Sequence, residues 1–285
     1  MVEQQTQARP QTQVNPSNLF GLDIGRGMTK VVSGTGRHEA IESYCMRGFK
    51  RMFAQGGSSK IVSKVDGIEY FLDELARKEG ANKHLTKSKN HENTTALGLT
   101  ALHLCGANGE IHVFTCVPLD SWEQEGPLVQ KRLKGEHNVE VGGVRRTIYV
   151  KTCAVIPETW AFASLWNEQG LVRIVDAGAK DTTLLTLDDG DLVENGTTVV
   201  PEGWETSNGG DKGVAPFVNL LAKEAGSRGW AETDKVVLIG SRAEDMLEAW
   251  KQNGFSSTTL PKGTDPGFAN AYGCLEAGKE HFNVG

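Results

Sequence analysis

The segment LFGLDIGRGMTKVV, residues 19–32, decides the fold that this chain is expected to adopt. Its apolar run ends at Asp23, and Gly25 follows before a second strand-like run starts at Met28. This order predicts a β-hairpin with an acidic residue at its tip. Turn amides can point at phosphate oxygens, a glycine lets a ligand approach the backbone, and a carboxylate can meet a magnesium ion through water. The hairpin is therefore a candidate phosphate and metal site.

A second copy of the pattern, VRIVDAGAKDTTLLTL, occupies residues 172–187. Asp176 and Gly178 repeat the spacing of Asp23 and Gly25 about half a chain later. Asp-x-Gly is common turn chemistry, so a single copy would indicate a turn and no more. Two copies, each behind an apolar strand, form an approximate internal repeat and favour two related halves that bind one ligand together.

The composition is that of an acidic globular chain. It has 285 residues, 38% hydrophobic and 23% charged, with a formal net charge of −6. A protein that grips DNA directly normally carries a basic face, so the charge argues against direct DNA binding. No apolar run approaches the roughly 18 residues of a membrane span. With five scattered cysteines, no CxxC pair and no visible signal peptide, we expect a reduced, cytoplasmic protein with no membrane segment.

Strand and helix patterns alternate along the chain, which predicts an α/β fold. The Gln- and Pro-rich residues 1–17 are expected to be a disordered tail. Further strands are expected at 110–117, 145–155 and 235–239, and helices at 94–105, 158–167, 214–224, 243–252 and 268–278. Pro157 is expected to open the second of these helices, because proline is favoured in a first turn.

Together with the two hairpins, three further segments resemble, in order, the motifs of the actin and sugar-kinase superfamily. They are Val155–Ala161 as the first connecting helix, Val236–Ser241 as the adenosine turn and Phe268–Gly273 as the second connecting helix. Within that superfamily the chain is similar to bacterial plasmid-segregation actins of the ParM type. The resemblance implies an actin-like, ribonuclease H-like ATPase fold with a nucleotide cleft between two domains.

The resemblance also sets the expected domain bounds and their departures from the family. Domain I is expected to comprise residues 18–160 and 262–285, and domain II residues 161–261. Ala179 stands where family members often have a second glycine, and the adenosine turn continues into Ser241 and Arg242. The stretch between the second hairpin and the adenosine turn is short, which implies a reduced subdomain IIB as in the Alf-type actins.

The resemblance assigns roles to particular residues. Asp23, Asp176 and Glu158 are the expected catalytic residues. The two aspartates hold Mg²⁺ through water, and Glu158 orients the attacking water, although a first-turn glutamate favoured by the helix dipole would look the same. Expected contacts to ATP or ADP are Gly25, Arg26, Gly27, Met28, Thr29, Lys30, Gly178, Ala179, Lys180, Asp181, Thr182, Gly209, Gly210, Asp211, Gly240 and Ser241.

The implied function is ATP-driven assembly into filaments that segregate plasmid DNA. The expected partners are further copies of the chain and a DNA-bound adaptor of the ParR type. Two alternatives stay open: a small-molecule kinase of the same superfamily, and a nucleotide-gated binding module that does not polymerise. Glu158 suits a reaction in which water, and not a sugar, accepts the γ-phosphoryl group. The basic stretch at residues 83–91 is expected to be a solvated loop.

Overall fold

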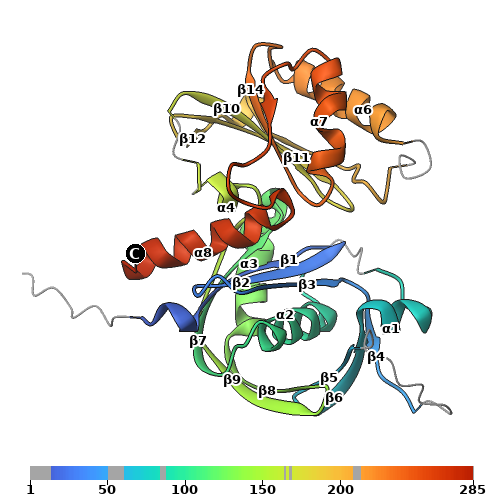
Figure 1. Cartoon of the computed structure of the whole chain (residues 1–285), viewed down its shortest axis with the longest axis vertical. Coiled ribbons are helices and arrows are strands. Elements are labelled where there is room, and N and C mark those ends of the chain that lie inside the picture. Colours follow the sequence, from blue (N-terminus) through green and yellow to red (C-terminus); the bar gives the residue numbers. More distant parts are fainter. Residues whose placement is uncertain are drawn as a thin grey trace, which may run out of the picture.

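The chain forms two lobes, each built on its own β-sheet, in a computed structural model that describes residues 14–50, 61–83, 88–163, 165–166, 169–207 and 213–284. The large lobe carries a nine-stranded sheet and the small lobe a six-stranded sheet (Figure 1). In the described residues no helix is long and apolar enough to cross a membrane. The α/β architecture with two sheet-based domains that the sequence predicts is confirmed.

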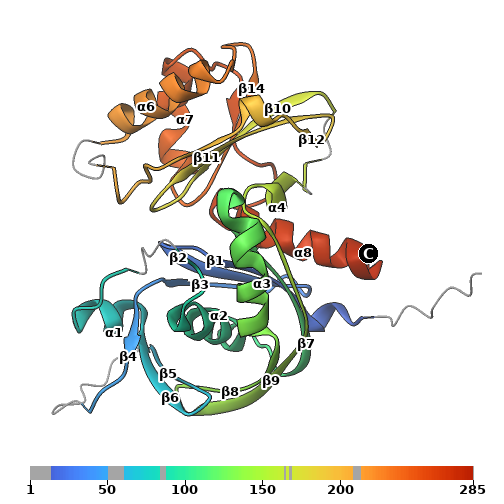
Figure 2. The ribbon, with the colours of Figure 1, turned by 180° about the vertical axis from the view of Figure 1, so that it is seen from behind.

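The large lobe follows the strand order β3-β2-β1-β7-β9-β8-β5-β6-β4. Its central strands β1, β7 and β9 run parallel, and the hairpin partner β2 is antiparallel to β1. The sheet curves around helix α2 (Figures 1 and 2). The strands are β1 (Leu19–Ile24), β2 (Met28–Ser33), β3 (His38–Glu42), β4 (Cys45–Arg47), β5 (Ile61–Val65), β6 (Ile68–Leu72), β7 (Gly109–Val117), β8 (Gly135–Val141) and β9 (Val144–Pro157). The helices are α1 (Asp73–Lys78), α2 (Glu92–Leu104), α3 (Trp122–Leu133) and, at the chain's end, α8 (Ala269–Phe282).

Strand β1 is buried on both faces, which explains its unbroken apolar run. Phe20, Leu22 and Ile24 belong to the core that includes α2, whereas Leu19 packs with α8. Gly21 also faces α8, and a Cβ atom there would lie 2.0 Å from the carbonyl oxygen of Ala271. The helix can approach the strand this closely only because residue 21 has no side chain.

The small lobe has the strand order β12-β11-β10-β14-β15, with β13 paired to β11. Helices α6 and α7 share one apolar core with this sheet, in which Trp250 is fully buried. The strands are β10 (Leu171–Ala177), β11 (Thr182–Asp188), β12 (Asp191–Leu192), β13 (Thr198–Val200), β14 (Lys235–Ile239) and β15 (Thr258–Thr259); the helices are α6 (Val214–Ser227) and α7 (Ala243–Gln252). Between β13 and β14 the described residues hold a single helix, α6, and it packs on the sheet. This agrees with the expected reduction of subdomain IIB.

Both hairpins are confirmed, as are the strands at 110–117, 145–155 and 235–239 and the helix at 243–252. The helices expected at 94–105, 214–224 and 268–278 are present with shifted ends, the last preceded by a 3₁₀ turn, Pro266–Phe268. Helix α2 begins earlier than expected because the side chain of His91 caps it by accepting from the N–H of Asn93. The predicted tail, residues 1–17, is wrong for its last four residues, since Val14 is buried and Pro16–Asn18 forms a 3₁₀ turn; residues 1–13 lie outside the described residues.

The prediction of a helix at residues 158–167 is wrong. Pro157 is the last residue of β9 and pairs with Val117, so it ends a strand and does not open a helix. The N–H of Glu158 donates to the carbonyl oxygen of Val117 at 2.7 Å, and Thr159 turns the chain with a positive φ of 66°. Helix α4 is then only Trp160–Ala163. Strand pairing therefore overrides the first-turn preference of proline.

Candidate functional site

The strand register directs both hairpin aspartates toward the same helix. Successive side chains of a strand point to opposite faces, so Asp23 shares the face of Leu19 and Gly21, which is covered by α8. In β10, Asp176 shares the face of Val172 and Ile174, whose core includes Ala269 at the start of α8. The two aspartates, one from each lobe, therefore both lie on the face of their sheet that packs with α8.

A cleft of about 860 Å³, solvent at its mouth included, lies between the lobes and contains both hairpins. The predicted residues that line it are Asp23, Gly25, Arg26, Gly27, Met28, Lys30, Glu158, Asp176, Gly178, Ala179, Lys180, Asp181, Gly240 and Ser241. The structure thus gathers residues from separate sequence motifs around one space.

Two predicted contacts do not line the cleft. The hydroxyl of Thr29 meets that of Ser43 at 3.1 Å, and the hydroxyl of Thr182 donates to the carbonyl oxygen of Glu202 at 2.8 Å. Strand alternation turns both side chains away from the ligand space. Gly209, Gly210 and Asp211 lie outside the described residues.

Both turns need glycine two residues after the aspartate. A Cβ atom on Gly25 would lie 2.6 Å from the carbonyl oxygen of Met28, and one on Gly178 would lie 2.7 Å from that of Asp181. The tips also touch across the cleft, where Nη1 of Arg26 meets Oδ2 of Asp181 at 2.9 Å. This ion pair joins the two lobes at the tips of the hairpins.

Asp23 is a buried carboxylate in a cationic setting. Burial raises its pKa, and the charges of Lys30 and Lys89 oppose that rise. Nζ of Lys30 lies 3.9 Å from Oδ2, and the thiol of Cys116 donates to Oδ1 at 3.8 Å. The carboxylate is thus held at the cleft wall with limited contact to water.

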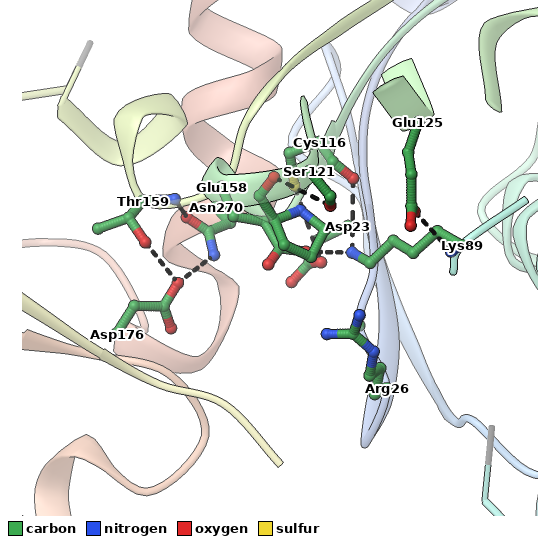
Figure 3. A network of polar contacts seen from close by, with 12 residues as sticks. Asp23, Arg26, Lys89, Cys116, Ser121, Glu125, Glu158, Thr159, Asp176 and Asn270 are labelled. Carbon is green, nitrogen blue, oxygen red and sulfur yellow. Dashed lines mark hydrogen bonds and ion pairs between the residues drawn. The ribbon is translucent and has the colours of Figure 1, made fainter. Parts of the chain in front are cut away.

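Asp176 is held by two donors from outside its own hairpin (Figure 3). The side-chain amide of Asn270 donates to Oδ2 at 2.7 Å, and the hydroxyl of Thr159 donates to the same oxygen at 3.2 Å. Burial raises the pKa of Asp176 to about 6, and the hydrogen bond from Asn270 acts against the rise. One oxygen of Asp176 is therefore fixed by α8 and by the turn after β9.

Glu158 also lies in the cleft, paired with a lysine that the sequence did not single out. Nζ of Lys89 forms an ion pair with Oε1 of Glu158 (Figure 3). Residues 83–91 are predicted to be a solvated loop. Residues 84–87 lie outside the described residues, and for Lys89 the prediction is wrong, because Lys89 is buried and lines the cleft. No local pattern separates Lys89 from Lys83, so only the tertiary structure reveals its place.

The end of the cleft at Gly240 and Ser241 has an aromatic and cationic wall. The guanidinium of Arg242 lies over the ring of Trp204, 4.2 Å from its centroid, next to Gly240 and Ser241. A planar guanidinium on an indole offers a flat surface against which a nucleotide base can stack. Neither residue was a sequence prediction, although Arg242 directly follows a predicted one.

The donor set fits Mg²⁺. Asp23, Asp176 and Glu158 offer carboxylate oxygens, which a hard cation prefers, and they come from both sides of one cleft. Oxygens of Asp23 and Glu158 lie within 4.8 Å of each other, as does the sulfur of Cys116. Burial is the main cause of the raised pKa of both aspartates, and a cation bound beside them would favour their charged forms.

Comparisons with known proteins agree with this architecture. Residues 21–160 match the family described as actin like proteins N terminal domain. No curated protein sequence matches the chain at a significant level.

Three solved structures illustrate the likeness of the whole chain. The filament of AlfA from the B. subtilis plasmid pLS32 is 19% identical, with a TM-score of 0.74 over 90% of this chain and 97% of AlfA. A 15-stranded ParM filament from Clostridium botulinum is 19% identical, with a TM-score of 0.75 over 92% and 98%. The archaeal actin homologue Ta0583 in complex with ADP is 16% identical, with a TM-score of 0.74 over 92% and 99%.

At such low identities the structural likenesses show the fold, and the match to the family model is confined to residues 21–160. Residues 21–160 are therefore similar to the N-terminal domain of actin-like proteins, and the whole chain has the fold of bacterial and archaeal actin homologues.

Proposed function

We propose that the chain binds ATP with Mg²⁺ in the interlobe cleft, hydrolyses it, and uses the nucleotide state to control its assembly into filaments. The observation that carries this proposal is the meeting of two acidic hairpins, one from each lobe, with Glu158 in one cleft. A nucleotide bound there would contact both lobes at once.

Each part of the cleft has a chemical task in this proposal. The turn amides after Gly25 and Gly178 bind the phosphates, because such turns place N–H groups around an anion. Asp23 and Asp176 hold Mg²⁺, which neutralises phosphate charge when it is bound. Glu158 orients the water that attacks the γ-phosphate, and the adenosine lies toward the Arg242–Trp204 wall.

Hydrolysis can control assembly because the nucleotide bridges the lobes. A ligand shifts a conformational equilibrium by its difference in affinity for the two states, so ATP and ADP favour different lobe angles if they contact the hairpins differently. The Arg26–Asp181 ion pair would respond to the lobe angle, since it connects the tips of the two hairpins. Subunit affinity would follow the lobe angle.

The cellular role that we propose is the segregation of plasmid DNA. It is supported by the likeness to AlfA from a B. subtilis plasmid and to a ParM filament. The net charge of −6 disfavours a direct grip on DNA, so a DNA-bound adaptor of the ParR type would make the connection. We place the chain in the cytoplasm on the same grounds.

The test is assembly in the presence of nucleotide. Light scattering and sedimentation with Mg-ATP, with Mg-AMPPNP and without nucleotide should show reversible polymer at micromolar protein, with disassembly following phosphate release. A chain that stays monomeric with both nucleotides over a range of salt concentrations contradicts the filament proposal. A chain that binds Mg-ATP without releasing phosphate contradicts the ATPase proposal alone.

A further inference from the structure

Lys89 is a buried lysine whose backbone is fixed beside the cleft. Only 3% of the residue is exposed, and it lies just before α2. Its N–H donates to Oε2 of Glu125 at 2.6 Å, and Glu125 is itself a buried residue of α3. A buried carboxylate is a strong acceptor, so this bond holds the main chain of Lys89 in place. This backbone contact therefore fixes the direction in which the side chain of Lys89 extends.

The ammonium of Lys89 reaches the acidic residues of the cleft (Figure 3). It pairs with Oε1 of Glu158 and lies 3.5 Å from the carbonyl oxygen of Cys116. Its charge also acts on Asp23, whose pKa it lowers against the effect of burial. The side chains of Lys89 and Glu158 are 4% and 16% exposed, so water screens their attraction little.

Stability alone gives a weak reason for this pair. Removing two charges from water costs about as much as their attraction returns, so a buried ion pair often stabilises no better than an apolar pair would. Lys89 and Glu158 both line the ligand space. An ion pair in that position controls where a carboxylate points in the site, which an apolar pair could not do.

We infer that Lys89 is a positioning residue for ATP hydrolysis, holding the Glu158 carboxylate at the cleft wall where it orients the attacking water. This inference rests on the function proposed above. In the reaction, the water oxygen bonds to the γ-phosphorus while the bond to the β–γ bridging oxygen breaks. ADP leaves with that electron pair, and the water's proton passes through the Glu158 carboxylate to phosphate or solvent. Lys89 acts only through the placement of Glu158.

The experiment is a double-variant cycle with Lys89→Met, Glu158→Gln and the two combined. Single-turnover phosphate release at saturating Mg-ATP gives the rate, and titration with a fluorescent ADP gives the affinity. We expect Lys89→Met to slow release on the order of a hundredfold, as misplacement of a catalytic group does. Glu158→Gln should slow it on the order of a hundredfold or more. The double variant should be no slower than Glu158→Gln, because Lys89 has nothing left to position.

Two further variants separate positioning from loss of structure. Lys89→Arg keeps the charge and should recover part of the rate. Lys151→Met removes a half-exposed lysine paired with Glu110 away from the cleft and should leave the rate unchanged. The amount of polymer that each variant forms with Mg-AMPPNP is measured by sedimentation. Each phosphate-release rate is divided by this amount, so that the variants are compared at equal assembly. The double variant leaves no unpaired charge from this pair, so a rate that stays low while the thermal midpoint recovers excludes misfolding as the cause.

Four results would overturn the inference. A Lys89→Met rate equal to wild type refutes it while the proposed ATPase stands. Rate losses that multiply in the double variant mean that Lys89 acts independently of Glu158. A weakened affinity for ADP with an unchanged rate at saturation makes Lys89 a binding residue. If wild-type protein binds Mg-ATP and releases no phosphate, the proposed function fails first, and the inference fails with it.

Discussion

Asp176→Asn should stabilise the ligand-free protein and at the same time weaken its binding of Mg-nucleotide. Burial raises the pKa of Asp176 from an ordinary 3.8 to about 6, so the ionised carboxylate is disfavoured in the folded chain. Asparagine keeps an oxygen that can accept from Asn270 and Thr159. The variant therefore loses the unfavourable charge without losing these hydrogen bonds.

The size of the effect follows from the pKa. A tenfold change in an acid dissociation constant corresponds to about 1.4 kcal/mol, so the whole rise in the pKa of Asp176 would correspond to about 3 kcal/mol. Water at the cleft mouth reaches Asp176, which is only partly buried, and screening reduces this to about 1–3 kcal/mol. For a chain of this size that is a rise of several degrees in the thermal midpoint, at about 2–4 °C per kcal/mol.

The pH dependence gives the sharper test. A carboxyl whose folded pKa is raised costs stability fully above the folded pKa, and the cost disappears below the unfolded pKa. In EDTA-treated protein the variant's advantage should therefore be largest above a pH of about 6 and should shrink as the pH falls toward about 4. Asp188→Asn, at the exposed far end of β11, is the matched control and should show no such trend. An advantage that is absent in mildly alkaline buffer, or independent of pH, refutes this reasoning.

Two further substitutions test the packing of α8 and the base end of the cleft. Gly21→Ala should lower the free energy of unfolding by about 1–3 kcal/mol or more, because its Cβ atom has no room against α8. Gly226→Ala in α6 has open space and should raise it by about 0.5–1 kcal/mol, so equal melting midpoints for the two variants would contradict the close approach. Arg242→Ala should weaken ATP binding about fivefold or more by removing the guanidinium over Trp204, at about 1 kcal/mol for such a contact. Calorimetric titration checks this against the half-exposed Lys251→Ala, and equal affinities would remove Arg242 from the base site.

The sequence by itself determined the two hairpins and therefore the class of the fold. An apolar run that ends in Asp-x-Gly and resumes as a strand is a local signal, because turn chemistry and strand burial both act on neighbouring residues. The same holds for β14 and α7, whose bounds the sequence predicts as observed. The cleft residues that belong to the hairpin tips could be predicted from the sequence because they lie within this local signal.

Only the tertiary structure decided how the cleft is completed. Pro157 ends a strand because Val117 lies alongside it, a contact between segments far apart in sequence. Lys89 enters the site because Glu125 of α3 holds its backbone, and nothing in the residues around it reports that contact. Asn270 and Arg242 also enter the cleft through tertiary structure, because α8 and the start of α7 are packed beside it. Hydrogen bonds and ion pairs between distant segments leave no periodic trace in a single sequence, so the residues that hold Asp176 and Glu158 in position emerged from the fold.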